Sequence, residues 1–234
     1  MCTVSYIYCN GTSIITSNRD EKVVRPSALP PQEYEWKDKK IVYPKDPQAG
    51  GTWYVVSKEG TLIVLLNGAE EKHVAKEQYR KSRGLIVLDV IAADSPLTAL
   101  EQIDLTDIEP FTLVVFQSGT LFQFRWDEVE KAFTTLDPTQ QYIWSSATLY
   151  PKEIRDQRSE WFRDFMASHV AIDPQKMVAF HTQTEAENTE NGLVINRGDF
   201  LKTLSVTQTV FDEEGIQMRY FDLQTQKKTV QQIK

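Results

Sequence analysis

Short runs of β-branched and aromatic residues, separated by turn residues, recur along the whole chain. Such runs are typical of strands in an antiparallel sheet. Asn10-Gly11 and Ser118-Gly119 each connect two of these runs, and a two-residue turn of this kind predicts a β-hairpin. The expected strands span residues 2–8, 12–17, 53–57, 61–66, 112–117, 120–126, 142–146, 204–212 and 216–223.

Helical periodicity is clearest between Pro151 and His169. Its apolar positions recur at helical spacing, at Ile154, Trp161, Phe162, Phe165 and Met166. On this helix Arg155 and Arg158 are three residues apart. We expect them to form surface salt bridges, or alternatively to meet an acidic group of a substrate. Shorter helices are expected at 95–103 and 174–181. The apolar run 85–91 fits either a buried strand or a core helix.

The remaining segments are polar or rich in proline. Residues 26–51 are expected to form a long loop over a sheet edge, either as a connector or as a lid over the site. The polar stretch 182–191 is expected to form a flexible loop, and the polar tail 224–234 is expected to fray. Because no Pro/Gly/Ser-rich linker divides the chain, we expect one domain over residues 1–234.

Composition narrows the function classes. The net charge of −7 among 234 residues argues against a nucleic-acid-binding surface. The sequence contains no run of 18 apolar residues, so no integral membrane segment is expected. No signal peptide is expected either. The two cysteines, Cys2 and Cys9, have opposite strand parity, so a disulfide between them is not expected. This cysteine usage fits a reducing compartment, and the expected location is cytoplasmic. The oligomeric state is left open.

Cys2 is the main candidate for chemistry. If Met1 is removed, Cys2 becomes an N-terminal cysteine that carries both a thiol and an α-amine. The amine can accept the thiol's proton, so such a residue needs no histidine as a base. The alternative is that Cys2 packs as a small hydrophobic residue, as most buried cysteines do. The three histidines, His73, His169 and His181, lack metal-ligand spacing and are expected at the surface or at helix ends. No metal and no cofactor are expected.

The Asn10-Gly11 hairpin brings the end of its second strand back to the start of its first. Asn18, Arg19 and Asp20 are therefore expected beside Cys2. Arg19 would favour the thiolate, and Asp20 would orient the amine or pair with Arg19. The alternative is an ordinary surface turn that ends the strand.

Several motifs together resemble the NRDE family, also called the transport and Golgi organisation family. They are MC at 1–2, NRDE at 18–21, RPS at 25–27, GGTW at 50–53, GTLIVLLN at 60–67, SRG at 82–84 and SVTQTVF at 205–211. The resemblance implies the N-terminal-nucleophile hydrolase architecture, an α+β four-layer αββα sandwich of two antiparallel sheets. It also favours a helix for residues 85–91. The family is distantly similar to choloylglycine hydrolase and penicillin V acylase, which cleave non-peptide amide bonds.

Carried over residue by residue, the resemblance implies that Cys2 is the nucleophile, with Arg19 and Asp20 beside it. Arg19 and Asp20 are adjacent here, whereas the acylases separate the two by two residues, and adjacent strand residues face opposite sides. The acylases also carry an asparagine oxyanion donor where this chain has Ser146. Loss of one such donor typically costs about 10²–10³ in rate. Asn67 is an alternative donor.

Two functions remain open. The first is a hydrolase-like protein with an N-terminal cysteine nucleophile, acting on a small-molecule amide or acyl ligand at a non-peptide C–N bond. The second is a non-catalytic carrier of a hydrophobic or acidic ligand, such as an acyl-CoA-like lipid or haem. In the haem case the Cys2 thiolate would be the iron ligand.

Overall fold

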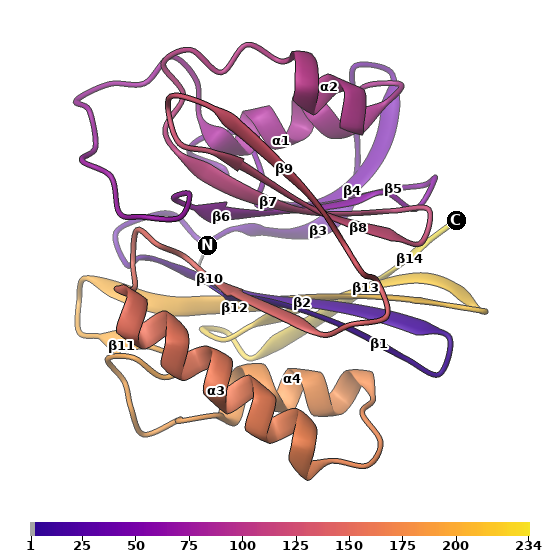
Figure 1. The fold of residues 1–234 in the computed structure, drawn as a ribbon, viewed down its shortest axis with the longest axis vertical. Coiled ribbons are helices and arrows are strands. Elements are labelled where there is room, and N and C mark those ends of the chain that lie inside the picture. Colours follow the sequence, from indigo (N-terminus) through magenta and orange to yellow (C-terminus); the bar gives the residue numbers. More distant parts are fainter. Residues whose placement is uncertain (1–2) are drawn as a thin grey trace. The chain divides into compact units, whose positions relative to one another are not determined.

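The computed structural model describes residues 3–234 and has an α+β fold (Figure 1). Contacts within these residues divide them into two compact units. Residues 3–25 and 139–232 form the first unit, and residues 26–138 form the second. Each unit consists of one seven-stranded antiparallel sheet and two helices over the described residues. The expected fold class is thus confirmed, while the single domain over 1–234 stays a prediction.

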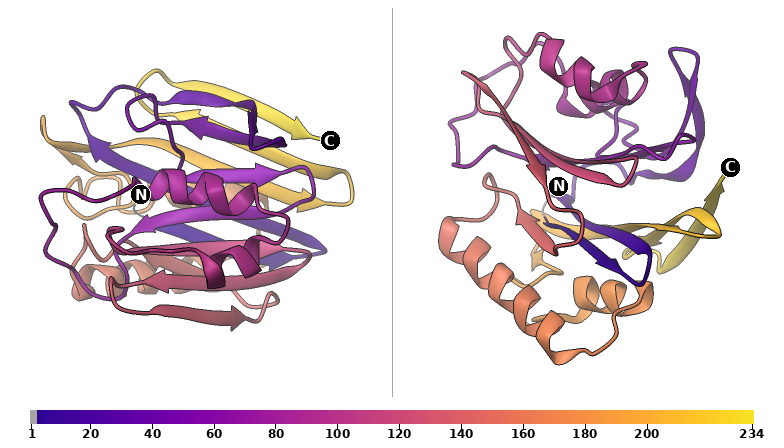
Figure 2. Two further views of the ribbon diagram at one scale, coloured as in Figure 1. Left: turned by 90° about the horizontal axis from the view of Figure 1, so that it is seen from above. Right: turned by 45° about the vertical axis from the view of Figure 1, so that its right-hand side comes forward.

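The first unit has the strand order β10-β1-β2-β12-β13-β14, with β11 paired to β12. Helices α3 and α4 lie against one face of this sheet (Figure 2, right), which we call its helix face. The elements are β1 (Thr3–Cys9), β2 (Thr12–Lys22), β10 (Tyr142–Ser145), α3 (Lys152–Ser168), α4 (Pro174–Gln183), β11 (Asn196–Arg197), β12 (Leu201–Asp212), β13 (Gly215–Asp222) and β14 (Lys227–Ile233).

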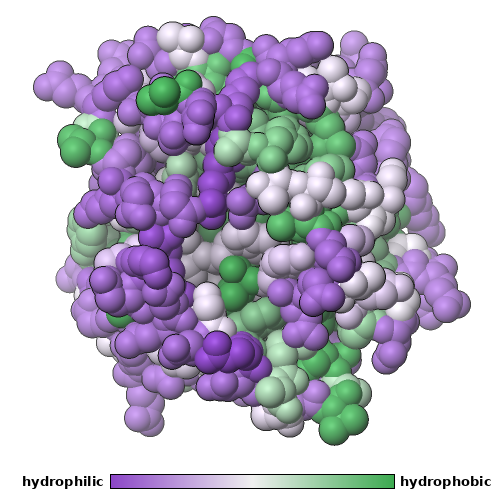
Figure 3. All heavy atoms as spheres, in the orientation of Figure 1, coloured by the Kyte–Doolittle hydropathy of each residue, from purple (hydrophilic) through white to green (hydrophobic). Residues whose placement is uncertain are grey.

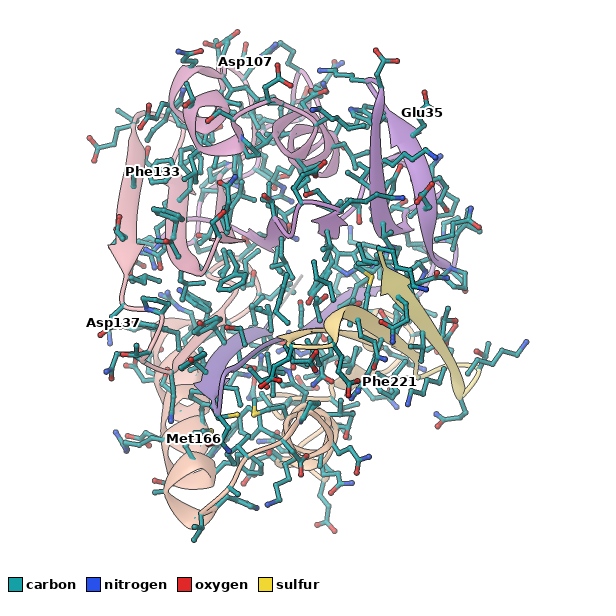
Figure 4. All side chains as sticks on the ribbon, turned by 90° about the vertical axis from the view of Figure 1, so that its right-hand side faces the viewer. Glu35, Asp107, Phe133, Asp137, Met166 and Phe221 are labelled. Carbon is teal, nitrogen blue, oxygen red and sulfur yellow. The ribbon has the colours of Figure 1, made fainter. Side chains whose placement is uncertain are left out.

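An apolar cluster joins the helices to the middle of the β1–β2 hairpin. Ile7 and Ile14 pack there against Phe162 of α3 and Met177 of α4. Met166, labelled in Figure 4, packs against the same cluster. The helical stripe predicted for residues 151–169 therefore faces the sheet, because side chains three and four residues apart share one face of a helix.

The second unit has the strand order β3-β4-β5-β6-β7-β8-β9. Helix α1 packs on β5 and β6 and contacts α2. The elements are β3 (Leu29–Trp36), β4 (Lys39–Lys45), β5 (Tyr54–Ser57), β6 (Leu62–Asn67), α1 (Arg83–Ile91), α2 (Pro96–Gln102), β7 (Phe111–Gln117), β8 (Thr120–Trp126) and β9 (Lys131–Leu136). The helix favoured for residues 85–91 is confirmed as α1.

Two of the sequence motifs meet at the start of α1. A Cβ atom on Gly51 would lie 2.5 Å from the backbone carbon of Gly84, and one on Gly84 would lie 2.9 Å from the carbonyl oxygen of Thr52. Real Cβ atoms do not come so close to backbone. The N–H of Thr52 donates to the carbonyl of Gly84 at 3.3 Å. Gly51 of GGTW and Gly84 of SRG are therefore required by a close approach of two backbone segments.

The expectation that residues 26–51 form a long loop is wrong. This segment contains β3 and β4, joined by Lys37 and Asp38 at positive φ of 48° and 63°. Lys-Asp is not a strong hairpin-turn signal, so the turn escaped sequence analysis. Pro30 and Pro31 are tolerated because β3 is an edge strand, where a missing N–H breaks fewer ladder hydrogen bonds.

The expectation that residues 224–234 form a frayed tail is also wrong, because β14 occupies most of this segment. Strand β9 was not expected either. Both are edge strands, and most of their side chains are exposed or half-buried. A strand without a buried face lacks the alternation that identifies strands in a sequence. Phe133 of β9 (Figure 4) contacts the ring of Phe124 at 5.4 Å between centroids.

Hydrophilic residues cover most of the molecular face drawn in Figure 3, and the hydrophobic residues there form separate patches. Across the part of the chain that the structure describes, no helix has the length and apolar character needed to cross a membrane.

We expect Gly51→Ala to lower the free energy of unfolding by about 1–3 kcal/mol, because an added methyl group overlaps the backbone of Gly84. Urea denaturation measures this change. Gly119→Asn is the matched control, because Gly119 has open space around it and a φ of 75°, which asparagine tolerates. If Gly51→Ala has no larger effect than the control, the close approach does not explain the motif.

Candidate functional site

The β1–β2 hairpin organises the candidate site. Asn10 and Gly11 have φ of 49° and 79°, as a two-residue hairpin turn requires. The register places Thr3 opposite Asn18. Strand β2 continues to Lys22. The Asn18–Glu21 segment is therefore part of a strand, and its interpretation as a surface turn is wrong.

Cys2 lies outside the described residues. Thr3, the next residue, pairs with Asn18 on β2 and with Ser145 on β10. Arg19 and Ser146 directly follow those two partners in the chain. The structure thus gathers four candidate residues around the beginning of β1, namely Asn18, Arg19, Asp20 and Ser146. Asn67 ends β6 in the second unit, where it pairs with Phe111.

Because β2 is extended, its consecutive side chains point to opposite faces of the sheet. Asn18 and Asp20 point to the helix face, where their hydrogen-bond partners lie. Arg19 points to the other face, as does Glu21, and its guanidinium lies 3.8 Å from the carboxylate of Glu21. Since no turn interrupts the strand, Arg19 and Asp20 do not share a face.

Arg19 is almost fully buried, with 2% of its surface exposed. Its positive charge also reaches Tyr220 on β13. Burial, and to a smaller extent the charge of Asp222, raises the pKa of the Tyr220 hydroxyl, while the charge of Arg19 acts in the opposite direction. The face that carries Arg19 therefore holds a buried cation beside a half-exposed carboxylate and a neutral phenol.

Asp20 accepts two short hydrogen bonds on the helix face. The hydroxyl of Tyr150 donates to one carboxylate oxygen and that of Thr203 to the other, each at 2.5 Å. A bulge between Thr203 and Ser205 shifts the register of β12 against β2 at this point. Because both carboxylate oxygens have a hydroxyl donor, this pair of hydrogen bonds holds the Asp20 side chain in one orientation.

Asn18 ties the hairpin to the segment around α4. Its Nδ2 donates to the carbonyls of His181 and Leu193 at 2.9 and 2.7 Å. Its Oδ1 is then the acceptor for the Nδ1–H of His181. The neutral ring leaves Nε2 as an acceptor, and the Ser5 hydroxyl donates to it at 2.7 Å. All three side chains are buried, and hydrogen bonds join them into one chain that runs from Ser5 through His181 to Asn18.

The Ser5–His181–Asn18 chain has the connectivity of a catalytic triad. All three side chains have no exposed surface, so a substrate cannot reach Ser5. Burial, together with the charge of Arg158, lowers the pKa of His181 to about 3. The imidazole is therefore neutral at pH 7, and the chain of hydrogen bonds is a buried structural element. The expectation that His181 lies at the surface or caps a helix is wrong.

Arg158 of α3 is fully buried, which corrects its assignment to the surface. Its Nη1 donates to the Thr3 hydroxyl at 2.6 Å, and its Nη2 donates to the carbonyl of Gly192 at 2.6 Å. The guanidinium carbon lies 3.6 Å from the centre of the Tyr150 ring.

Sequence analysis missed Arg158 and His181, although a signal was present. Arg158 is four residues from both Ile154 and Phe162, so it lies within the apolar stripe of α3. His181 is four residues after the buried Met177. A polar residue on the buried stripe of a helix is a candidate for a satisfied internal hydrogen-bond network.

Groups of His, Cys, Asp and Glu with the geometry to hold a metal ion were not found among residues 3–234.

The buried histidine makes stability depend on pH. Below about pH 6.5 the unfolded chain binds a proton at His181, while the folded protein does not until about pH 3. We expect this histidine alone to remove about 2 kcal/mol of unfolding free energy between pH 7.5 and 5. Urea denaturation across this range should give a shallower dependence for His181→Gln. His169→Gln removes a histidine outside the network and should retain the parental dependence; an unchanged slope in His181→Gln would contradict the assignment.

The structure is similar to those of three hydrolases. Penicillin V acylase from Agrobacterium tumefaciens has a TM-score of 0.59 at 11% identity, covering 100% of this chain and 86% of that one. The N-acylethanolamine-hydrolyzing acid amidase ortholog of Caenorhabditis elegans has a TM-score of 0.61 at 10% identity, covering 90% and 92%. The C2A mutant of the conjugated bile acid hydrolase of Clostridium perfringens has a TM-score of 0.51 at 10% identity, covering 100% and 97%.

At these identities the similarity establishes the fold alone, which is that of the N-terminal-nucleophile hydrolases. The sequence has no significant match among curated proteins. Residues 1–230, nearly the whole chain, match the family described as Transport and Golgi organisation 2. The chain therefore belongs to the Transport and Golgi organisation 2 family.

Proposed function

We propose that this protein is an N-terminal cysteine nucleophile hydrolase-like protein that acts on a non-peptide C–N bond, with Cys2 as its nucleophile. The observation that carries the proposal is the register of β1. Thr3 pairs with Asn18 and Ser145, and the residues that follow those partners are Arg19 and Ser146. We assign Arg19 and Ser146 as the neighbours of Cys2 on this basis.

The structural neighbours support the reaction class. Their names denote an acylase, an acid amidase and a hydrolase. The bile acid hydrolase structure is of a C2A mutant, so a cysteine is the second residue of its parent protein as well. A fold does not determine a function, so the proposal depends on Cys2 being reactive.

In the proposed reaction the α-amine of Cys2 accepts the thiol's proton, and the thiolate attacks the amide carbonyl. Collapse of the tetrahedral intermediate breaks the C–N bond, and the ammonium returns its proton to the leaving amine. Water then attacks the thioester with the amine again as base, releasing the acid and the thiol. Arg19 stabilises the thiolate or a substrate carboxylate. Ser146 donates to the oxyanion.

Asp20 has a different assignment from the one that the sequence suggests. Its carboxylate accepts hydrogen bonds from Tyr150 and Thr203 on the helix face, whereas Arg19 points to the opposite face. We propose that Asp20 and Asn18 hold β2 in place and that Arg19 acts on the thiol.

A carrier of a hydrophobic or acidic ligand, such as an acyl-CoA-like lipid or haem, is the second candidate. The feature that favours it is Ser146, which by the family resemblance stands where the acylases have an asparagine. A serine hydroxyl is shorter than a carboxamide and less fixed, which weakens an oxyanion hole.

We expect iodoacetamide at pH 7 to alkylate Cys2 about tenfold faster than Cys9, and we expect the native protein to have lost Met1. An activated thiol has a lowered pKa, whereas burial and Asp173 raise the pKa of Cys9, whose thiol donates to the carbonyl of Ile172 at 3.2 Å. Intact mass and peptide mapping measure both outcomes, and Cys2→Ala should remove the fast phase.

A retained Met1 together with slow labelling of Cys2 would rule out the hydrolase mechanism. Titration with haem and with acyl-CoA would then test the carrier. If Cys2 does label fast, a screen of small amides identifies the substrate class.

We expect Arg19→Gln to slow Cys2 alkylation at pH 7 by up to about tenfold, because losing an adjacent cation raises a thiol pKa by roughly one unit. Arg25→Gln is the matched control, because Arg25 also pairs with Glu21 at 3.8 Å but is 29% exposed. Rates measured from pH 5 to 9 separate a changed pKa from a changed limiting rate. Equal rates for parent and Arg19→Gln would remove Arg19 from the mechanism.

A further inference from the structure

Arg158 is unusual as a buried charge. None of the salt bridges between described residues involves Arg158. The hydroxyl of Thr3 and the carbonyls of Gly192 and Asn191 satisfy its donors, at 2.6 to 3.3 Å. The nearest connected carboxylate is that of Asp20, which Arg158 reaches through Tyr150.

Stability alone does not account for this arrangement. Removing an unpaired guanidinium from water is costly, and apolar residues of similar size often replace buried charges without loss of stability. Arg158 also occupies the apolar stripe of α3, between Ile154 and Phe162, where leucine or methionine would extend the packing. The position of Arg158 therefore points to a role that depends on its hydrogen bonds.

The hydrogen bond to Thr3 is the informative contact. Thr3 is the first described residue of β1 and directly follows Cys2 in the chain. One end of the guanidinium holds Thr3, and the other end holds residues 191–192 next to Leu193, which also binds Asn18. Arg158 thus links the start of β1 to the strand that carries Arg19.

We infer that Arg158 is a positioning residue, which fixes Thr3 through the Thr3 hydroxyl and thereby holds the neighbouring Cys2 in place against Arg19. This inference rests on the proposed function, since it assigns how that site is held. Arg158 does not contact substrate in this assignment. It acts from the helix face, opposite to the face that carries Arg19.

Paired substitutions at Thr3 isolate the hydrogen bond. Thr3→Ser retains the hydroxyl, whereas Thr3→Val has nearly the shape of threonine but cannot accept the hydrogen bond from Arg158. We expect Thr3→Val to slow iodoacetamide alkylation of Cys2 by about tenfold, because misplacing a reacting group by about 1 Å can cost up to a hundredfold. Thr3→Ser should react at the parental rate.

Arg158→Gln should slow the reaction by a similar factor, and the double variant Thr3→Val/Arg158→Gln should be no slower than the slower single variant. Effects that act through one shared contact are not additive. Arg163→Gln is the matched control on α3, because Arg163 is 71% exposed. It should leave the rate unchanged.

Cys9 reports on general loosening of the fold. It lies on the same strand as Thr3 and is half-buried, so a variant that merely loosens β1 exposes its thiol and speeds its alkylation. The positioning role predicts slower labelling of Cys2 with unchanged labelling of Cys9, resolved by peptide mapping of the same sample.

The two proposals fail in distinguishable ways. Slow labelling of Cys2 in the parent protein contradicts the proposed function and this inference with it. Fast labelling in the parent with unchanged labelling in Thr3→Val overturns this inference alone. Additive effects in the double variant, or faster labelling of Cys9, assign Arg158 a purely structural role and also overturn it.

Discussion

The antiparallel register of β1 and β2 is the constraint on which the candidate site depends. The Asn10-Gly11 turn sets this register, and it pairs Thr3 with Asn18 at the far end of the hairpin. Because side chains alternate along a strand, the same register sends Arg19 to one face of the sheet and Asp20 to the other. A shift by one residue would exchange these faces, so the hairpin must be held against slipping.

Two different sets of contacts on the helix face prevent such a shift. Near the turn, Ile7 and Ile14 pack into the apolar cluster under α3 and α4. Near Thr3, hydrogen bonds from Arg158 and Asn18 replace apolar packing. Apolar contacts tolerate small displacements, whereas a buried hydrogen bond is lost when its partners move apart, and leaving a buried group unpaired costs about 1–3 kcal/mol. The polar contacts therefore lie where position matters most to the proposed chemistry.

Element type could be predicted for most segments that bury one face, although the buried strand β4 was missed together with its edge partner β3. The hairpin at Asn10-Gly11, the helix α3 and the helix α1 follow from turn chemistry and periodicity, or for α1 from the family resemblance. The edge strands β3, β9 and β14 did not follow, because exposed strands lack a buried face to produce a pattern. Each of them pairs with the strand next to it in the chain, β4, β8 or β13, and backbone hydrogen bonds of this kind leave no mark on the pattern of side chains.

The sequence by itself determined that Asn18, Arg19 and Asp20 return to the start of the first strand, because a two-residue turn dictates which residues face each other. The class of the fold was also available from the sequence, as what the resemblance of its motifs to a known family implies. Only the tertiary structure decided that Asp20 is held by Tyr150 and Thr203, and that Arg158 and His181 are buried beside the hairpin. These partners are more than a hundred residues away along the chain, and local spacing carries no information about contacts that form when a helix packs on a sheet.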